Sequence, residues 1–340
     1  MTAPRTLVYV AGSWHTGSTL LNLLLDGHSQ ISGLGEIHWL FVGVNTGKQP
    51  EHCACGRPLE RWDVGSCSCG EALESCLRRR GITAELDELT GIPDAVRVLP
   101  TTDPLYLNRG GDGVCVHEGG PAGPVQPVNP NFNRVMMILG SRRLCDLGAR
   151  FSSDVATNRA AVRNSLLLIE ATRRATGTPI VVDTTKAPAR MKGLYLYADE
   201  RFLVLNLVRD GRAVCYSRMR REGVTMQEAA QNWKLDHFKY VLTRRTIPSS
   251  SETRVRYEEL CRAPGAELTR ICAALGVPFE EAMLDFRSAD RHMVGGNPMR
   301  FRHQEAEIRL DERWKGELTA DDLSTFERIA GRLNRRLGYS

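Results

Sequence analysis

The sequence predicts an α/β fold in which a parallel β-sheet is flanked by helices. Short apolar runs alternate with helix-like segments along the chain. The runs are continuous rather than alternating, as in parallel strands that are buried on both faces. The polar residues best suited to chemistry follow directly after several of these runs. Ligands of such sheets lie at the carboxyl ends of the strands, so we expect the site there.

Four apolar runs are predicted to be strands, and helices are predicted between or after them. The predicted strands are residues 7–11, 179–183, 202–208 and the shorter 253–257, and the clearest predicted helices are 159–176 and 266–275. Together these elements predict a single domain that spans residues 1–340.

The stretch 43–150 differs from the rest of the chain. It contains paired cysteines, a charged helix-like piece near 77–89 and a Gly/Pro-rich run over 100–130. Long loops of this kind often cover binding sites. We interpret 43–150 as a lid-like insertion that caps the domain, and a plain surface loop is the alternative.

The amino-acid composition limits the classes of ligand and partner that we expect the protein to bind. The 340 residues are 42% hydrophobic and have a net charge of +5, which suits a small polyanionic ligand but is far below a nucleic-acid-binding composition. No run of 18 apolar residues predicts a membrane span, and the N-terminus does not resemble a signal peptide. We therefore predict a cytoplasmic protein with reduced thiols, a small-molecule substrate, and neither a nucleic-acid nor a membrane partner.

A glycine loop follows the first predicted strand. Its sequence is Gly12-Ser13-Trp14-His15-Thr16-Gly17-Ser18-Thr19, which has the G-x-x-x-x-G spacing of a P-loop. A strand, a glycine loop and a helix in this order turn backbone N–H groups toward an anion. Ser18 stands where a triphosphate-binding loop has lysine, which argues against the β- and γ-phosphates of ATP.

Two basic sites follow other predicted strands. Arg209 ends one strand, and Ser217 lies eight residues later on a predicted helix, so that both could converge on one anion. Lys186, in Asp183-Thr184-Thr185-Lys186, could place a point charge on a transferring group. Solvated surface positions are the alternative for each of these residues.

These residues give the chain a resemblance to the sulfotransferases that use 3′-phosphoadenosine 5′-phosphosulfate (PAPS). His15-Thr16-Gly17-Ser18-Thr19 resembles the family's 5′-phosphosulfate loop, and Arg209 with Ser217 resembles its 3′-phosphate motif. The segment 256–260, Arg-Tyr-Glu-Glu-Leu, is similar to the family's Arg-Tyr-Glu-x-Leu. Glu36 matches a glutamate of tyrosylprotein and many bacterial members. The resemblance implies a bacterial-type, P-loop-like sulfotransferase fold.

The resemblance also implies roles for individual residues. Those expected to bind PAPS, or the product PAP, are Thr16, Gly17, Ser18, Thr19, Arg209, Ser217, Tyr257 and Arg300. Arg300 is included because Gly295–Arg300 occupies the place of the family's basic segment near the C-terminus. Glu36 is the expected general base. His15 stands where the family usually has lysine or arginine, and its charge varies near neutral pH.

The predicted reaction moves a sulfuryl group from PAPS to a hydroxyl acceptor on a small molecule or secondary metabolite. Glu36 takes the acceptor proton, which favours a phenol because its pKa is closer to that of a carboxylate. His15 and Lys186 neutralise developing charge, and the transfer itself needs no metal. The alternatives are a nucleotide or small-molecule kinase with an altered P-loop and a non-catalytic anion-binding protein.

Five cysteines and two histidines leave further alternatives open. The chain repeats a Cys-x-Cys-Gly unit, and a fifth thiol follows: the residues are Cys53, Cys55, Cys67, Cys69 and Cys76. Zinc binding, disulfides and free thiols are all compatible with this cluster, although Cys-x-Cys is tighter than the usual zinc spacing. His38 shares a face with Glu36 if that segment is extended. His117 lies in the predicted lid.

Overall fold

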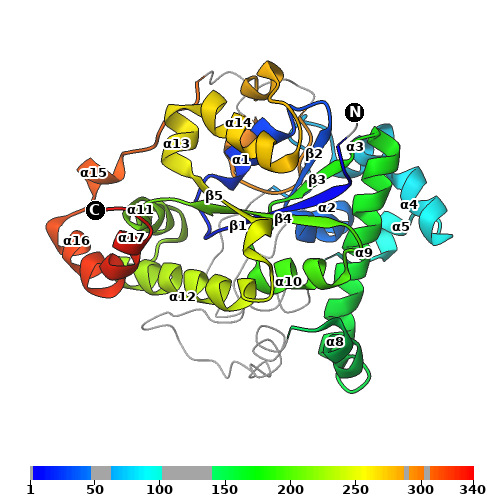
Figure 1. Cartoon of the computed structure of the whole chain (residues 1–340), viewed down its shortest axis with the longest axis horizontal. Coiled ribbons are helices and arrows are strands. Elements are labelled where there is room, and N and C mark those ends of the chain that lie inside the picture. Colours follow the sequence, from blue (N-terminus) through cyan, green and yellow to red (C-terminus); the bar gives the residue numbers. More distant parts are fainter. Residues whose placement is uncertain (1–2, 47–62, 102–139, 287–290, 302–306) are drawn as a thin grey trace.

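The computed structural model describes residues 3–46, 63–101, 140–286, 291–301 and 307–340. Within these ranges five strands form one parallel sheet in the order β2-β3-β1-β4-β5 (Figure 1). The strands are β1 (Thr6–Ala11), β2 (Ile31–Gly35), β3 (Ile180–Asp183), β4 (Arg201–Val208) and β5 (Glu252–Arg256). The predicted parallel sheet is confirmed. β2 was not among the predicted strands.

Helices cover both faces of the sheet (Figure 1). The helices on one face are α1 (Ser18–Leu25), α13 (Tyr257–Arg262) and α14 (Pro264–Leu275), and those on the other are α9 (Ser153–Thr176), α10 (Pro188–Tyr197) and α12 (Met226–Arg244). Along β1, Val8 and Val10 pack in the core beneath α1, whereas Leu7 and Tyr9 pack in the core beneath α9 and α10. Each strand therefore needs apolar residues on both faces, which explains its continuous apolar sequence.

A third apolar cluster joins α11 (Gly211–Glu222) and α12 to the C-terminal helices, with Trp233 and Phe326 at its centre. The C-terminal helices are α15 (Trp314–Glu317), α16 (Ala320–Phe326) and α17 (Arg332–Arg336). None of the helices in the described ranges is long and apolar enough to cross a membrane.

Part of the predicted insertion packs on the main core. It contributes α3 (Leu73–Arg79), α4 (Ile82–Thr90), α5 (Ala95–Val98) and α8 (Arg142–Gly148), and α2 (Leu40–Thr46) leads into it. The single helix expected near 77–89 is two helices, because Gly81 adopts a left-handed φ of 75° between them. Leu77 and Leu86 share one core with Leu7 of β1. The lid-like role of 43–150 and the single-domain boundary stay predictions.

Candidate functional site

The polar residues singled out in the sequence gather at one edge of the sheet. The loop from Gly12 follows β1, Glu36 follows β2, Lys186 lies three residues after β3, Arg209 follows β4 and Tyr257 follows β5. Because all five strands are parallel, their carboxyl ends meet at the same edge. The structure therefore brings these candidates to the edge where a ligand is expected.

Two glycines allow the loop after β1 to pack closely. A Cβ on Gly12 would lie 2.5 Å from the carbonyl oxygen of Leu207. Gly17 has a φ of 96°, and a Cβ there would lie 2.3 Å from Cδ2 of Tyr257. Gly17 is also the N-cap of α1, and its capping position has no side-chain hydrogen bond. The first N–H groups of α1, from Ser18 and Thr19 onward, have no partner within the helix and suit an anion.

Arg209, which follows β4, binds this loop through hydrogen bonds. Its Nη1 donates to the carbonyl oxygen of His15 at 2.9 Å, and its Nη2 donates to that of Asp311 at 3.0 Å. Its Cζ lies 4.4 Å from the ring centroid of Tyr257, in cation–π contact. Arg209 thus fixes the shape of the loop. Its predicted contact with a 3′-phosphate stays a prediction.

His15 lies in the loop with a left-handed φ of 64° and a buried side chain. Its Nε2 is 3.0 Å from Oε1 of Glu222 on α11. Burial lowers the pKa of His15 below its ordinary value, so the imidazole is neutral at pH 7. Burial alone would raise the pKa of Glu222, but the charge of Arg218 and the hydrogen bond with His15 bring it to about 2. The neutral imidazole therefore donates its Nε2–H to a carboxylate.

Glu36 and Lys186 form a buried ion pair. Nζ of Lys186 donates to Oε1 of Glu36 at 2.5 Å and to the carbonyl oxygen of Thr184 at 3.0 Å. Lys186 has a left-handed φ of 67°, which directs its side chain back over this turn. Oγ1 of Thr184 is buried and has no hydrogen-bond partner among the described residues. Two of the three predicted catalytic residues are thus in direct contact.

Hydrogen bonds among neighbouring buried residues hold the turn next to this pair. Oδ1 of Asp183 accepts from the Thr185 N–H at 2.8 Å, and Oδ2 accepts from Nε of Arg190 at 3.1 Å. Nδ1 of His38 lies 3.2 Å from Oγ1 of Thr185. His38 belongs to the 3₁₀ turn Ile37–Trp39, so the extended segment in which it would share a face with Glu36 does not form. Burial, together with Arg190 and Lys186, holds the pKa of His38 well below its ordinary value.

The segment 291–301 lies against both the glycine loop and Glu36. The Glu36 N–H donates to the carbonyl oxygen of Val294 at 2.8 Å, and the Asn297 N–H donates to Oγ1 of Thr19 at 2.9 Å. A Cβ on Gly295 would lie 3.2 Å from Cβ of Glu36, so the approach is close. The structure thus places this segment beside the glycine loop and Glu36.

Arg300 and Ser217 have mainly backbone partners. The Arg300 guanidinium is buried and donates to the carbonyl oxygens of Ser66, Met293 and Asp63. No contact among the described residues supports the predicted phosphate role of Arg300. Ser217 lies on α11, a helix as predicted, and its hydroxyl donates to the carbonyl oxygen of Ala213 at 2.9 Å. Its convergence with Arg209 on one anion stays a prediction.

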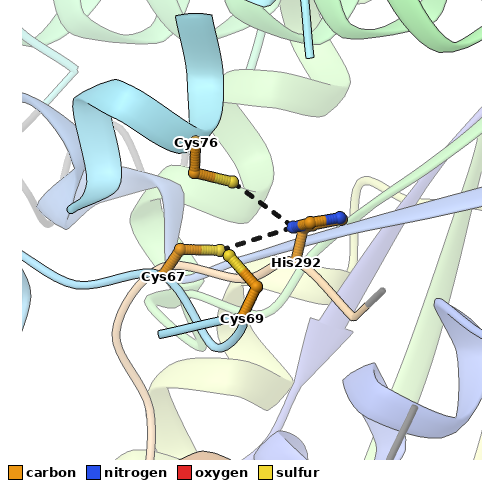
Figure 2. A group of neighbouring side chains, drawn as sticks. All are labelled: Cys67, Cys69, Cys76 and His292. Carbon is orange, nitrogen blue, oxygen red and sulfur yellow. Dashed lines mark hydrogen bonds between the residues drawn. The ribbon is translucent and has the colours of Figure 1, made fainter. Parts of the chain in front are cut away.

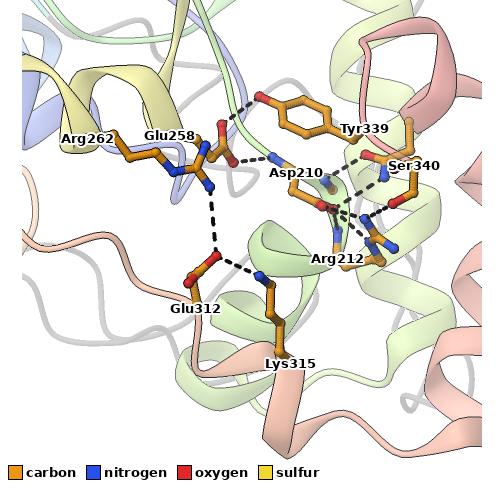
Figure 3. Close-up of polar contacts among 10 residues, drawn as sticks. Asp210, Arg212, Glu258, Arg262, Glu312, Lys315, Tyr339 and Ser340 are labelled. Carbon is orange, nitrogen blue, oxygen red and sulfur yellow. Dashed lines mark hydrogen bonds and ion pairs between the residues drawn. The ribbon is translucent and has the colours of Figure 1, made fainter.

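The C-terminal residues tie together the ends of β4 and β5 (Figure 3). Arg212 donates from Nε and Nη2 to the two carboxylate oxygens of Asp210 and also reaches the carbonyl oxygen of Ser340 at 2.6 Å. Glu258 accepts from the Asp210 N–H at 3.0 Å and from the Tyr339 hydroxyl at 2.7 Å. This network holds the turns that carry Arg209 and Tyr257.

Comparison with known proteins relates part of the chain to a family. Residues 146–281 match the profile of the sulfotransferase family, a segment that includes Lys186, Arg209, Ser217 and Tyr257. The chain has a sulfotransferase-family segment and a sulfotransferase fold. The glycine loop and Glu36 lie outside the matched segment, so the structure alone relates them to it.

Solved sulfotransferase structures resemble the whole chain. The sulfotransferase domain of the Synechococcus PCC 7002 olefin synthase matches with a TM-score of 0.50 and 18% identity over 97% of this chain and 96% of that one. A sulfotransferase domain from the curacin biosynthetic pathway matches at 0.48 and 18%, over 100% and 99%. Sulfotransferase STF9 from Mycobacterium avium matches at 0.44 and 18%, over 100% and 78%. No curated protein sequence matches the chain.

Some contacts of the candidate site were not foreseen from the sequence. One such contact is that of Glu222 with His15. The others are those of Val294 with Glu36 and of Asn297 with Thr19. The Gly295–Arg300 segment was related to the cofactor through the family resemblance, which did not indicate these contacts. Cys53, Cys55 and His117 lie outside the described residues.

Proposed function

We propose that this chain is a PAPS-dependent sulfotransferase that transfers a sulfuryl group to the hydroxyl of a small molecule, with a phenol as the favoured acceptor. The observation that supports this most is the buried Glu36–Lys186 pair at the sheet edge that also holds the glycine loop. A proton acceptor, a cation and a set of anion-binding N–H groups thus meet at one edge.

The residues present fit a phosphosulfate donor. The first turn of α1 offers N–H groups and the hydroxyls of Ser18 and Thr19, and no side chain caps the helix. Ser18 replaces the lysine of a triphosphate loop, so the site offers less positive charge than ATP requires. Arg209 and Ser217 are proposed to hold the 3′-phosphate, Tyr257 the adenosine, and residues 16–19 the 5′-phosphate.

PAPS would supply the sulfuryl group. The acceptor oxygen forms a bond to sulfur as the bond from sulfur to the 5′-phosphate oxygen breaks, and PAP leaves with the electron pair. Glu36 takes the acceptor proton, and Lys186 donates hydrogen bonds to the oxygens on which charge develops. His15 is neutral at pH 7, so we assign it a hydrogen-bonding rather than a charged role. A carboxylate base favours a phenol over an alkyl alcohol because the proton transfer is less uphill.

Two measurements test this function. Calorimetric titration with PAP, ATP–Mg and sulfate should show the tightest binding for PAP. Incubation with PAPS and matched phenols and alkyl alcohols should then produce PAP, faster with the phenols. Tighter binding of ATP–Mg would favour a kinase. PAP binding without turnover of any acceptor would favour a non-catalytic anion-binding protein.

One pair of variants tests whether PAP binding depends on the proposed site and not on the sheet in general. Arg209→Ala removes the loop brace and the proposed 3′-phosphate contact, so PAP affinity should fall at least about tenfold. Arg201→Ala is the matched control, because Arg201 lies at the opposite end of β4 and donates to the carbonyls of Leu275 and Ala274. An unchanged PAP dissociation constant in Arg209→Ala would refute the assignment.

A further inference from the structure

Four side chains from three segments converge beside α3. Cys67 and Cys69 come from the turn before this helix, Cys76 comes from the helix itself, and His292 comes from a segment more than 200 residues later (Figure 2). Their sulfur atoms and one ring nitrogen all lie within 4.8 Å of one another. Cys67 and Cys76 are buried, and Cys69 and His292 are partly buried.

Backbone hydrogen bonds hold these four residues close together. The Gly70 N–H donates to the Cys67 carbonyl at 2.9 Å, and Gly70 has a left-handed φ of 89°, which closes a tight turn. This turn brings the side chains of Cys67 and Cys69 together despite their short spacing. His292 is fixed by its own N–H, which donates to Oδ2 of Asp26 at 2.8 Å. Its Nδ1 faces two sulfur atoms, at 3.3 Å from Cys76 and 3.7 Å from Cys67.

These separations match a tetrahedral metal site. Bond lengths of about 2.3 Å to sulfur and about 2.0 Å to nitrogen give tetrahedral edges of about 3.5–3.8 Å. Both sulfur–nitrogen separations around His292 are near these edges. The remaining atoms are close enough that small side-chain rotations complete the tetrahedron.

We propose that Cys67, Cys69, Cys76 and His292 bind one structural zinc ion through three thiolates and Nδ1 of the imidazole. Three sulfurs and one imidazole nitrogen form a donor set that zinc prefers. Four protein ligands leave no open position, so the site is structural rather than catalytic. Binding releases the three thiol protons to solvent.

The surroundings suit the charge of such a site. Zinc with three thiolates and a neutral imidazole has a net charge of −1. Arg79 interacts electrostatically with Cys76 and Cys69, and Arg300 interacts with Cys67. The three thiols are free of disulfides.

A second copy of the motif provides an internal comparison. Residues 67–76 are Cys-Ser-Cys-Gly-Glu-Ala-Leu-Glu-Ser-Cys, and residues 53–62 are Cys-Ala-Cys-Gly-Arg-Pro-Leu-Glu-Arg-Trp. Aligned, the first copy has Trp62 where the second has Cys76. The first copy therefore lacks the third thiol, and Cys53 and Cys55 offer a matched pair of control positions.

The proposed zinc ion joins the insertion to the segment that contacts the sulfotransferase site. Oγ of Ser68 donates to the Arg291 carbonyl at 2.5 Å and accepts from the Met293 N–H at 3.0 Å, on either side of His292. Val294 then contacts Glu36, and Asn297 contacts Thr19. We therefore assign the zinc a positioning role toward Glu36 and the glycine loop. The zinc proposal itself does not depend on the proposed reaction.

Metal analysis of the full-length protein tests this proposal. The purified wild-type chain should contain about one zinc per molecule. Cys76→Ser and His292→Ala should lose the zinc and melt at a lower temperature, whereas His292→Cys should retain it because it restores a ligand. The double variant Cys53→Ser/Cys55→Ser should retain the zinc. X-ray absorption at the zinc edge should show three sulfurs and one nitrogen.

Several results would overturn the zinc site. Iron with sulfide in place of zinc would identify a cluster instead, and an intact mass lower by two hydrogens would identify a disulfide. Loss of zinc in Cys53→Ser/Cys55→Ser but not in Cys76→Ser would place the metal at the other copy. If Cys76→Ser fails to fold, the X-ray absorption of the wild-type protein decides, since a shell other than three sulfurs and one nitrogen contradicts the ligand set.

Discussion

Lys186 has a backbone conformation that non-glycine residues rarely adopt, with a φ of 67°. Such a conformation costs on the order of 1–3 kcal/mol, and strain of this kind is concentrated at functional sites. Here it allows the ammonium group to donate both to Glu36 and to the Thr184 carbonyl next to its own turn. At the residue scale, the site is built around this one buried pair.

Glu36→Gln tests the proposed base. The amide keeps the size of the side chain but cannot accept a proton at neutral pH, so kcat should fall about 10²-fold or more. The PAP dissociation constant should change little, because Glu36 is proposed to contact the acceptor. Single-turnover rates and PAP titration measure the two effects separately. Glu280→Gln, which alters a carboxylate bonded to Ser29, is the control and should keep the wild-type rate.

The His15–Glu222 pair predicts a pH dependence of stability. The pKa of Glu222 is about 2 in the folded chain, below the ordinary value of 4.5. A lowered carboxylate pKa contributes stability that is fully present above pH 4.5 and is lost as the pH falls toward 2. Glu222→Gln should therefore lower the free energy of unfolding at pH 7 and reduce its loss on acidification. At pH 3.5 the difference between the variants should be smaller by about 1 kcal/mol.

Urea unfolding at pH 7, 4.5 and 3.5 measures this effect for the wild-type chain and Glu222→Gln. The difference between the two proteins removes the contribution of the other carboxylates. A difference that does not change with pH would show that Glu222 has an ordinary pKa.

At the scale of elements, the strand–loop–helix unit of β1 and α1 depends on close packing at Gly17. Tyr257, the first residue of α13, lies directly against it, so the unit is completed by the end of β5. The tyrosine ring is itself held under Arg209. Three strand ends thus determine the shape of one loop.

Gly17→Ala should disrupt this unit. The added Cβ would overlap the ring of Tyr257, and the φ of 96° disfavours any side chain, so we expect a loss of about 1–3 kcal/mol and weaker PAP binding. Gly177→Ala is the matched control: it also has a left-handed φ, 69°, but a Cβ there meets nothing within 4 Å. It should cost about 1 kcal/mol and leave PAP affinity unchanged. Equal effects of the two substitutions on PAP binding would contradict the packing argument.

Elements differed in how well the sequence predicted them. The four predicted strands have continuous runs of Val, Ile and Leu or alternation of valine and arginine, whereas β2 has the sequence Ile-Ser-Gly-Leu-Gly. This strand forms because tertiary partners fix it: it pairs with β3, Asp26 accepts from the Gly33 N–H, and Asn22 accepts from the Gly35 N–H. Such partners leave no periodic pattern in the strand itself.

The roles of the candidate site residues stay predictions, but the sequence did single out several of these residues. His15, Lys186 and Arg209 follow predicted strands, so local patterns could single them out in advance. Glu36 was singled out only through the family resemblance, because β2 was not predicted. The contacts of these residues connect segments that are distant in sequence: Lys186 reaches Glu36 across 150 residues, and His15 meets Glu222 across 207. Neither spacing nor composition encodes such pairs when only one sequence is considered.

At the scale of the whole molecule, the C-terminal helices stabilise the edge where the site lies. Asn334 is buried on α17, where its Oδ1 accepts from the Gly211 N–H at 2.9 Å and its Nδ2 donates to Oδ1 of Asp210 at 3.3 Å. The final residues of the chain thus hold the turn that follows β4 and begins α11.

Asn334→Ala should lower the free energy of unfolding by about 1–3 kcal/mol, because it leaves the buried Gly211 N–H without its partner and removes one donor to Oδ1 of Asp210. Arg335→Ala changes the neighbouring residue, whose ion pair with Glu327 is exposed, and should have little effect. Chemical denaturation of both variants measures the difference. Equal stabilities would show that α17 is not coupled to the turn after β4.

The parallel bridge between Gly35 and Val294 has a consequence beyond the site. β2 lies at one margin of the sheet, and edge strands expose N–H and C=O groups that pair readily with other chains. Val294 bonds to Leu34 and Glu36 on either side of this bridge and so covers the end of that margin. We therefore expect residues 291–301 to hinder pairing of this edge with other chains. If the segment detached, we expect that β2 would become a template for intermolecular pairing and that solubility would decline.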